Sequence, residues 1–419
     1  METHKLGKGP RAVVTGMGVV SPLGIGCETF WRNLSAGKSG VRPISLFSTD
    51  EFNVKYAGQV CDFDPAAGLA RKPPKTRDRA LQMAYVASAE ALRQSGLAGD
   101  DDTWQVDYPV ATVVGSGSGP CFEVEHGMDA YYLQGLRAVS PMTVPRSMFN
   151  MLSCNLSIHF GLRGPNHVVA AACASASSAI GEAYRLITSG TERAVLCGGT
   201  DSPLCRTMFS AWTRLRILAR NAHPESACRP FDADRNGLVL GEGSAMLVLE
   251  SEEDALRRGA EILCVVAGYG GSSDAFHITA PCKDGLQLAM NRCLSDAGVS
   301  PDEVDYVNAH GTGTELNDKL EAESVSELFG RRTEPLPLTS VKSSLGHSLG
   351  ASGGLELIAT VHAINHDFVP PTLNCDTPDP QVGLDYVPNQ GKHRSINVAM
   401  SNSFAFGGNN AVLMIRGHD

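Results

Sequence analysis

The sequence has few charged residues and no closely spaced cysteines. Only 19% of its 419 residues are charged and 42% are hydrophobic, which excludes a disordered chain and allows a sizeable core. Of the twelve cysteines, no two stand closer than Cys197 and Cys205, so no CxxC motif exists. Structural zinc and redox pairs are therefore not expected. We predict reduced cysteines, most of them in the core.

Long apolar runs and flexible linkers are also lacking. No run approaches the ~18 apolar residues of a membrane span, and the start METHKLGKGP lacks the apolar stretch of a signal peptide. We therefore predict a cytoplasmic protein. At ~150 residues per domain the length allows two or three units. Because no Pro/Gly/Ser-rich linker interrupts the chain, we expect one compact unit.

The charge balance excludes one class of partner. Lys and Arg number 35 against 45 Asp and Glu, so the net charge is −10, which is unfavourable for general nucleic-acid binding. One stretch departs from this average, and it is either a solvated loop leading into a helix or a docking patch for an acidic partner. Its basic residues are Arg71, Lys72, Lys75, Arg77 and Arg79.

Short β-rich runs alternate with helical patterns, which predicts an α/β chain. The runs lie at 11–21, 108–117, 193–199, 243–250, 262–270, 304–309, 395–401 and 410–416.

Two segments, 168–190 and 338–365, share one layout. In each, a β-run meets a turn with a reactive side chain, and a helix of small residues follows. After Cys173 the apolar residues recur on one helical face, and Gly190 suits the helix end. Leu355, Ile358, Ala359 and His362 repeat that face. We infer a duplicated structure whose two helices are buried near one centre.

Cys173 stands in Ala-Ala-Cys-Ala-Ser-Ala, directly before the first of these helices. Free N–H groups at the helix start would point at its sulfur, favour the thiolate and hold a developing oxyanion. The alternative is a buried, inert cysteine, as we expect for the other eleven.

Two histidines lie on polar turns after β-runs. His310 lies in Asn-Ala-His-Gly-Thr-Gly-Thr, and His347 follows Lys342 by five residues. A buried lysine needs a carboxylate, for which Glu321 is a candidate. The alternatives are a core histidine, and a capping box Asp318–Glu321 that opens a helix over 319–329.

Two further motifs imitate known fingerprints. Residues 15–21, TGMGVVS, resemble the opening of a dinucleotide-binding loop, but the third glycine is missing. Residues 346–350, GHSLG, fit GxSxG and would make Ser348 a nucleophile, with Asp376 or Asp385 and then His393 in hydrolase order. That alternative places the nucleophile unusually late in the chain and leaves Cys173 without a role.

Five ordered motifs together resemble the β-ketoacyl-acyl-carrier-protein synthases of the second type, condensing enzymes of the thiolase superfamily. They span nearly the whole chain: VVTGMGVVSPLG from residue 13, RPFDADRNGLVLGEGSAMLVLE at 229–250, NAHGTGTELND at 308–318, KSSLGHSLGASG at 342–353 and SNSFAFGGNN at 401–410. The resemblance implies a thiolase-like fold of two duplicated α/β halves, 1–258 and 259–419, in α-β-α-β-α layers.

The resemblance also implies a reaction. Cys173 would accept an acyl group from acyl carrier protein, and His310 and His347 would decarboxylate the malonyl thioester. Lys342 would support them, with Glu321 as its partner. No metal, nucleotide or redox cofactor is required, and the chain would form a homodimer or pair with a ketosynthase-like partner. The other implied positions are Phe406 in the oxyanion hole and gate, Phe404 beside it, Thr279, Thr312 and Thr314 along the phosphopantetheine arm, and Arg71, Lys72, Lys75 and Arg77 in the carrier-docking helix.

The chain departs from the family pattern at a few positions. Ala405 and Asn409 replace the usual Gly and Thr of the gating loop, and a Cβ at Ala405 removes backbone freedom. Ser118 stands where a bulkier apolar residue usually lines the acyl pocket, which suggests a differently shaped tunnel and a polyketide, polyene or modified fatty-acid pathway. Two alternatives stay open: a serine acyltransferase or hydrolase that uses Ser348, and a non-catalytic partner subunit resembling chain-length factors, which typically lack the cysteine.

Overall fold

A computed structural model describes residues 9–66, 69–73, 75–99, 101, 104–330, 332–380 and 383–418. One twelve-stranded mixed sheet runs through this part of the chain. All eight predicted β-runs are strands of this sheet. Its strands in spatial order are β13 (Leu384–Asp385), β11 (Leu336–Thr339), β10 (Tyr306–Asn308), β15 (Val398–Phe404), β16 (Asn409–Arg416), β9 (Cys264–Ser273), β1 (Ala12–Ser21), β8 (Gly243–Ser251), β7 (Ala194–Asp201), β5 (Ala111–Gly115) and β6 (Asn166–Val169), with β2 (Gly24–Ile25) beside β1.

The order of the strands shows where the earlier and the later part of the chain meet in the sheet. Strands β1 and β9 pair antiparallel over a short register, from Ala12 opposite Val266 to Val14 opposite Cys264. The earlier strands of the chain lie on one side of this junction and the later strands on the other. Only the outer pairs β5–β6, β5–β7, β10–β11, β10–β15 and β11–β13 are parallel.

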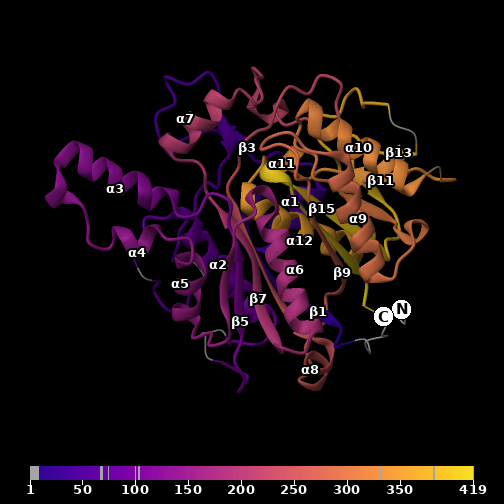
Figure 1. Cartoon of the computed structure of the whole chain (residues 1–419), viewed down its shortest axis with the longest axis horizontal. Coiled ribbons are helices and arrows are strands. Elements are labelled where there is room, and N and C mark those ends of the chain that lie inside the picture. The colour runs from indigo at the N-terminus through magenta and orange to yellow at the C-terminus, as the bar shows by residue number, and fades with distance from the viewer. Residues whose placement is uncertain are drawn as a thin grey trace.

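Helices α6 (Ser175–Thr188) and α12 (Ser352–Asn365) pack against each other and against strands from both sides of the junction (Figure 1). Their contact is close because small residues face each other: a Cβ at Gly353 would lie 2.1 Å from Oγ of Ser177. The predicted pair of buried central helices is therefore confirmed. Gly190 follows α6 with φ +73°, the left-handed conformation that suits glycine after a helix.

Further helices cover the outer faces of the sheet, which completes the α-β-α-β-α layers. Helix α2 (Arg79–Gln94) packs on β1, β7 and β8, while α9 (Lys283–Ala297) packs on β9 and β16, with α10 (Glu315–Phe329) beside it. The glycines of the TGMGVVS segment serve this packing, since they lie inside β1. A Cβ at Gly16 would lie 2.1 Å from the carbonyl oxygen of Ala91 in α2. These glycines allow a helix to approach a strand and form no phosphate-binding loop.

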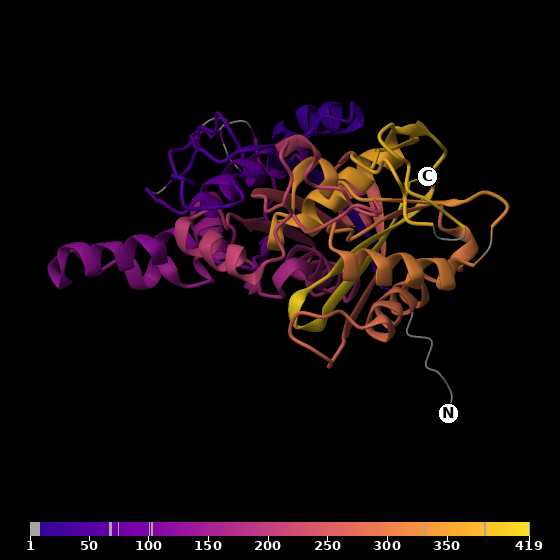
Figure 2. The same cartoon turned by 90° about the horizontal axis from the view of Figure 1, so that it is seen from above.

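One helical excursion leaves the body of the molecule. Helix α3 (Cys121–Gln134) projects outward and α4 (Thr143–Ser147) returns toward α5 (Met151–Phe160), as Figures 1 and 2 both show. The remaining described elements are α1 (Cys27–Ser35), α7 (Arg206–Leu215), α8 (Glu252–Arg257), α11 (Lys342–Leu345), and the small pairs β3 (Val41–Pro43) with β4 (Tyr56–Gly58) and β12 (Phe368–Val369) with β14 (Lys392–His393). No helix in the described ranges has the length and apolar character to cross a bilayer.

Candidate active site

Cys173 occupies a single 3₁₀ turn, Ala172–Ala174, between β6 and α6. Ala172 has φ +46°, a left-handed conformation unusual for alanine. The turn is fixed by Ser175, whose Oγ accepts from the N–H of Ala171 at 2.9 Å and donates to the carbonyl of Ala172 at 2.7 Å. Hydrogen bonding from the backbone N–H groups of Cys173 and Phe406 acts to lower the pKa of the Cys173 thiol. The predicted placement at a helix start is confirmed.

The predicted stabilisation of the thiolate is wrong for the resting site. Burial raises the pKa of Cys173 to about 11, although Lys342 and the Phe406 N–H act in the opposite direction. Desolvation disfavours the charged form more than the helix end and the N–H groups favour it. The thiol is therefore protonated at neutral pH, and its reaction as a nucleophile requires a base nearby.

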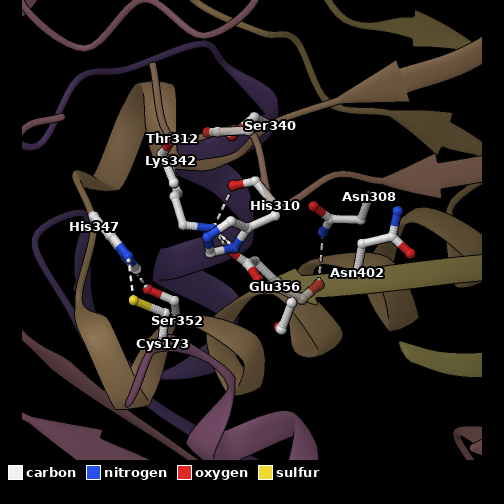
Figure 3. Close-up of polar contacts among 12 residues, drawn as sticks. Cys173, Asn308, His310, Thr312, Ser340, Lys342, His347, Ser352, Glu356 and Asn402 are labelled. Carbon is white, nitrogen blue, oxygen red and sulfur yellow. Dashed lines mark hydrogen bonds and ion pairs between the residues drawn. The ribbon is translucent and has the colours of Figure 1, made fainter. Parts of the chain in front are cut away.

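His347 supplies a base of that kind. Its Nε2 lies 3.0 Å from Sγ of Cys173, and its Nδ1 lies 2.9 Å from Oγ of Ser352, at the start of α12 (Figure 3). Burial and the charge of Lys342 hold the pKa of His347 well below its usual value. The imidazole is therefore neutral at neutral pH, and a neutral ring has one nitrogen that can accept a hydrogen bond. The sequence did not single out Ser352.

His310 lies at the end of β10, with its ring centroid 5.4 Å from that of His347. Its Nδ1 is 3.3 Å from Nζ of Lys342, which also donates to its carbonyl at 2.6 Å. An ammonium group has no acceptor, so Nδ1 accepts and the ring proton lies on Nε2. Burial, Lys342 and His347 hold the pKa of His310 well below its usual value. The ring is a neutral hydrogen-bond donor.

The carboxylate that pairs with Lys342 is Glu356 of α12, so the prediction of Glu321 as its partner is wrong. Both members of this ion pair are buried, and Figure 3 shows Glu356 below the lysine. Burial raises the pKa of Glu356, while Lys342 acts against that shift. Glu356 is the only charged side chain in α12, and this was the sequence signal that could have identified it.

Glu321 lies close by but holds backbone. Its two carboxylate oxygens accept from the N–H groups of His310 and Gly311, each at 2.8 Å. Asn402 donates to it as well, at 3.2 Å. Burial raises the pKa of Glu321 to about 7. It positions the turn that carries His310.

The predicted capping box at Asp318 is also wrong. Helix α10 begins at Glu315, with Thr314 at its N-cap, so Asp318 and Glu321 both lie inside the helix. Asp318 accepts instead from the N–H groups of Thr312 and Gly313, at 2.9 Å and 3.1 Å. The helix start therefore serves to hold the turn beyond His310.

Cys173, His310 and His347 face one cavity of about 280 Å³. Thr312 and Thr314 line it, with their hydroxyl oxygens 2.8 Å apart, and so does Thr279. Phe404 and Phe406 line it near the histidines, and the ring of Phe404 lies 6.1 Å from that of His310. The complete lining is Cys173, Trp212, Leu215, Ile217, Leu238, Thr279, Pro281, His310, Thr312, Thr314, Leu316, Asn317, His347, Phe404, Ala405 and Phe406.

The loop from Ala405 to Gly408 brings Phe406 to the sulfur. Ala405 is extended, with φ −126° and ψ 155°, a conformation open to any residue, so its Cβ is accommodated here without strain. Gly407 and Gly408 follow with φ of +81° and +75°. This reversal of the chain requires glycines, and it leaves Phe406 in the cavity lining.

Ser118 lies near the nucleophile but outside the lining of that cavity. Its Oγ donates to the buried carboxylate of Asp201 at 2.8 Å, which Ser116 also contacts at 2.6 Å. A Cβ at neighbouring Gly117 would lie 2.9 Å from the carbonyl oxygen of Ala172. Asp201 also accepts from the N–H of Gly350 at 2.7 Å. It therefore joins the Ser118 loop to the segment that follows His347, a link the sequence did not suggest.

The predicted basic docking residues do not lie on a helix. Arg71, Lys72, Lys75 and Arg77 are exposed and lie in the segment before α2. Arg79 begins α2 but turns inward to the buried carboxylate of Glu242, at 2.7 Å. The four residues therefore lie in an exposed loop that leads into a helix, while Arg79 lies inside the fold.

The structure contradicts a serine nucleophile at Ser348. This residue is fully buried, and its Oγ donates to the carbonyl of Glu242 at 3.2 Å. The proposed partners are engaged elsewhere: Asp385 pairs with Lys392, and His393 packs on Phe368. The neighbouring His347 turns to Cys173, so the GHSLG segment delivers a histidine and no serine.

Sγ of Cys173 and one ring nitrogen each of His310 and His347 lie within 4.8 Å of one another. Within the described ranges no other group of three such ligands is this close. Sulfur and imidazole ligands suit zinc. The charge of Lys342, however, already disfavours a positive charge on both imidazoles, so the arrangement suits neutral hydrogen-bond donors and acceptors better than a cation.

Comparisons with known proteins agree with this geometry. Residues 10–255 match the family model "Beta-ketoacyl synthase, N-terminal domain", and residues 263–376 match "Beta-ketoacyl synthase, C-terminal domain". The chain belongs to the β-ketoacyl synthase family. Two curated relatives named 3-oxoacyl-[acyl-carrier-protein] synthase 2 are similar over 97% of this chain and 98% of their own. The one from Synechocystis sp. is 40% identical, and the one from Staphylococcus aureus (strain N315) is 39% identical.

Solved structures of other ketosynthases share the fold. The ishigamide ketosynthase/chain length factor is 37% identical, with a TM-score of 0.91 over 98% of this chain and all of that one. A type II polyketide ketosynthase in complex with its acyl-carrier protein is 30% identical, with a TM-score of 0.89 over the same shares. A β-ketoacyl synthase from Burkholderia phymatum is 35% identical, with a TM-score of 0.89. The thiolase-like fold implied by the sequence motifs is confirmed.

Proposed function

We propose that the protein is a β-ketoacyl-acyl-carrier-protein synthase that condenses a Cys173-bound acyl group with a malonyl thioester, in fatty-acid or polyketide assembly. The observation that carries this proposal is the cluster of Cys173, His310 and His347 within 4.8 Å, in a cavity large enough for a thioester. The curated relatives are 3-oxoacyl-[acyl-carrier-protein] synthases and one similar structure is a type II polyketide ketosynthase, so the proposal includes both pathways.

In the first half-reaction Cys173 takes the acyl group. Its thiol passes a proton to Nε2 of His347, 3.0 Å away, and the sulfur attacks the carbonyl carbon of the acyl thioester. The N–H groups of Cys173 and Phe406, both of which act on the Cys173 thiol, would hold the oxyanion. The carrier thiolate leaves and takes the proton back from His347.

In the second half-reaction both histidines act as neutral donors. For His347 this requires the ring proton to move from Nδ1 to Nε2, after which Nδ1 accepts from the Ser352 hydroxyl. Their Nε2–H groups hold the carbonyl oxygen of the malonyl thioester, so the electrons of the breaking C–C bond form an enolate as carbon dioxide leaves. The enolate carbon attacks the Cys173 thioester. Collapse of the oxyanion releases the 3-ketoacyl product and returns the sulfur as thiolate, which is reprotonated.

The Lys342–Glu356 pair supports this step by fixing His310. The ammonium group holds Nδ1 of His310 as an acceptor, which keeps the proton on Nε2 where the thioester would lie. Glu321 fixes the same turn from the backbone side. Both carboxylates therefore act as positioning groups, although only Glu356 pairs with the lysine.

The cavity mouth suits the carrier arm. We assign Thr279, Thr312 and Thr314 to contacts with the amides of phosphopantetheine, because all three line the cavity. Arg71, Lys72, Lys75 and Arg77 are exposed and would meet an acidic carrier protein. For Ser118 we propose a place along the acyl chain, since its loop runs beside the nucleophile turn. A change in chain-length preference of Ser118→Ile is the expected result; an unchanged preference would remove that role.

The division into halves 1–258 and 259–419 is proposed on the same basis. The first half would supply the nucleophile and the second the histidines, with α6 and α12 meeting between them. The cytoplasmic location stays a prediction.

We propose that α3 and α4 pack against a second ketosynthase chain, in the simplest case another copy. Several large apolar side chains on this excursion face solvent: Tyr132 is 79% exposed, and Leu133 and Leu136 are each 76% exposed. Within the described ranges strand β6 is the last strand at one end of the sheet, and an edge strand can pair with an antiparallel strand of a partner. Light scattering should report a dimer that Tyr132→Glu dissociates; a monomer at both high and low concentration would contradict it.

Mapping the acyl group tests the function. The protein would be incubated with medium-chain acyl carrier protein without a malonyl donor, and the adduct located by peptide mass spectrometry. We expect the acyl group on Cys173, release of 3-ketoacyl product after malonyl-carrier is added, and an identical result for the matched variant Ser348→Ala. An adduct on Ser348 would establish a serine transferase. Acylation without condensation would contradict the proposed second half-reaction.

A further inference from the structure

Two cysteines from distant parts of the chain meet where α3 and α7 begin. Cys121 is the first residue of α3, and Cys205 is the N-cap of α7. Sγ of Cys121 lies 3.0 Å from the carbonyl oxygen of Ser202, shortly before Cys205 in the chain. One turn further along α3, Glu125 accepts from the N–H of Thr207 at 2.6 Å, shortly after Cys205. The first turns of α3 therefore contact the chain on both sides of Cys205.

An ion pair also holds these two helix starts together. Arg206, the first residue of α7, pairs with Asp129 at 2.5 Å and lies 3.7 Å from Glu125. Cys121, Glu125 and Asp129 follow one another at intervals of about one helical turn, so they form a row that faces the start of α7. Cys121 is 8% exposed and Cys205 is 2% exposed. A small reagent can therefore reach the two thiols more readily than a large one.

The two thiols differ in acidity, which gives them different chemical roles. Hydrogen bonding with Cys121 and from the N–H of Met208 lowers the pKa of the Cys205 thiol, while burial and Glu125 act in the opposite direction. Hydrogen bonding with Cys205 and burial raise the pKa of Cys121. The thiolate is the form of cysteine that reacts with oxidants. Cys205 is therefore the attacking thiol, and Cys121 is the resolving thiol.

We propose that Cys121 and Cys205 form a redox modification site, at which hydrogen peroxide joins the two thiols in a reversible disulfide. The Cys205 thiolate attacks one peroxide oxygen, and the O–O bond breaks to give a sulfenic acid and hydroxide. The hydroxide takes up the proton that Cys205 had lost and leaves as water. The Cys121 sulfur then attacks the sulfenic sulfur, the S–S bond forms, and a second water leaves with the Cys121 proton. The two thiols lose two electrons, and the peroxide is reduced to two waters.

The position of the pair connects it to the acyl site. Cys121 follows the loop of Ser118, which we place along the acyl chain, and Cys205 precedes α7, from which Trp212 lines the cavity. A disulfide would tie this loop to a helix of the cavity wall and restrict the space for an acyl chain. Resting on the condensing function proposed above, we expect the oxidised protein to acylate Cys173 more slowly than the reduced protein.

Disulfide mapping tests the site without reference to activity. The protein is treated with hydrogen peroxide, free thiols are blocked with iodoacetamide, and non-reduced peptides are analysed by mass spectrometry. We expect a Cys121–Cys205 cross-linked peptide with a mass loss of two hydrogen atoms, which dithiothreitol reverses. Cys121→Ser and Cys205→Ser should both lack it. The matched control Cys61→Ser should keep it, because Cys61 is more exposed but contacts Gln59.

Two outcomes of the mapping would overturn the modification site. One is recovery of both thiols in the alkylated form after peroxide treatment. The other is irreversible oxidation of Cys205 without a cross-link to Cys121, since a resolving thiol in contact would have prevented it.

A second measurement keeps the site separate from the proposed function. Peroxide is removed with catalase, and Cys173 acylation by medium-chain acyl carrier protein is followed by mass spectrometry. The oxidised unaltered protein should lose acylation rate relative to Cys121→Ser treated in the same way, and dithiothreitol should restore it. Direct oxidation of Cys173 is common to both proteins, so their difference reports the disulfide. Equal rates would overturn the effect on acylation. A disulfide in protein that never acylates Cys173, even when reduced, would overturn the proposed function and leave the modification site in place.

Discussion

Helices α6 and α12 occupy equivalent places in the two halves of the molecule but contact the nucleophile in different ways. Helix α6 presents its backbone start to Cys173 and buries no charged side chain. Helix α12 presents side chains: Ser352 contacts His347, and Glu356 contacts Lys342. One half can stabilise negative charge with fixed N–H groups, whereas the other can hold and transfer protons. The duplication has thus produced two surfaces of different chemistry around a single sulfur.

The largest expected effect comes from removing the sulfur. Cys173→Ala leaves both helices in place but has no nucleophile, so acylation should fall more than about 1,000-fold. Intact mass after incubation with acyl carrier protein measures this, and circular dichroism is the control for folding. Persistent acylation at another residue would refute the role of Cys173, at the start of α6, as the acyl acceptor.

The pH dependence of Cys173 reactivity tests how strongly the start of α6 lowers the pKa of the thiol. Its pKa of about 11 lies above neutral pH, so the thiolate fraction should rise about tenfold per pH unit from pH 7 to 10. Iodoacetamide labelling of the Cys173 peptide, followed by mass spectrometry, measures it. In the unfolded chain the same rise should level off near the ordinary thiol pKa of about 8.5. A plateau below pH 8 in the folded protein would show that the helix start prevails over burial.

Changing Glu356→Gln separates the two half-reactions. This substitution leaves Lys342 buried without a counter-charge, and loss of one partner of a buried pair destabilises by about 3–5 kcal/mol. We expect condensation to fall about 10- to 100-fold through loss of the His310 orientation, while Cys173 acylation changes less than about threefold. Denaturant unfolding and the two half-reactions are measured on the same protein. Equal losses in both half-reactions would contradict the assignment of α6 to acylation and of α12 to condensation.

The smallest expected effect on turnover comes from a substitution at the start of α12. Ser352→Ala removes the hydroxyl that contacts Nδ1 of His347 at 2.9 Å, and one such bond contributes about 1 kcal/mol, or roughly fivefold in rate. Ser348→Ala is the matched control, since that hydroxyl contacts only a backbone carbonyl. Steady-state turnover of both variants is the measurement. A greater loss in Ser348→Ala would reverse the assignment.

Local patterns made much of the site predictable. A cysteine before a small-residue helix and histidines after β-runs singled out Cys173, His310 and His347, which the fold brings within 4.8 Å of one another. Chemical sense alone required a carboxylate for Lys342 but chose Glu321, because that residue follows His310 closely in sequence. The partner, Glu356, became evident only once α12 was placed against the turn of His310. Sequence spacing does not fix such relative placement of elements from different parts of the chain.

The acidity of Cys173 illustrates a second limit. The helix start and the N–H groups were predicted from the local sequence, and they are present. The degree of burial depends on loops from other parts of the chain, including the one that carries Phe406. Burial raises the pKa of Cys173 by more than the helix start and the N–H groups lower it. A net pKa is a sum over the whole surroundings, and the sequence near one residue reveals only some of its contributions.

The apolar side chains on α3 and α4 carry a consequence for how the protein is handled. If another copy covers them, folding and association are one linked equilibrium, and the melting temperature becomes a function of protein concentration. Dilution would then act as a mild denaturant. Assays at nanomolar enzyme would sample a different population from those at micromolar enzyme, and a loss of specific activity on dilution would reveal the dissociation.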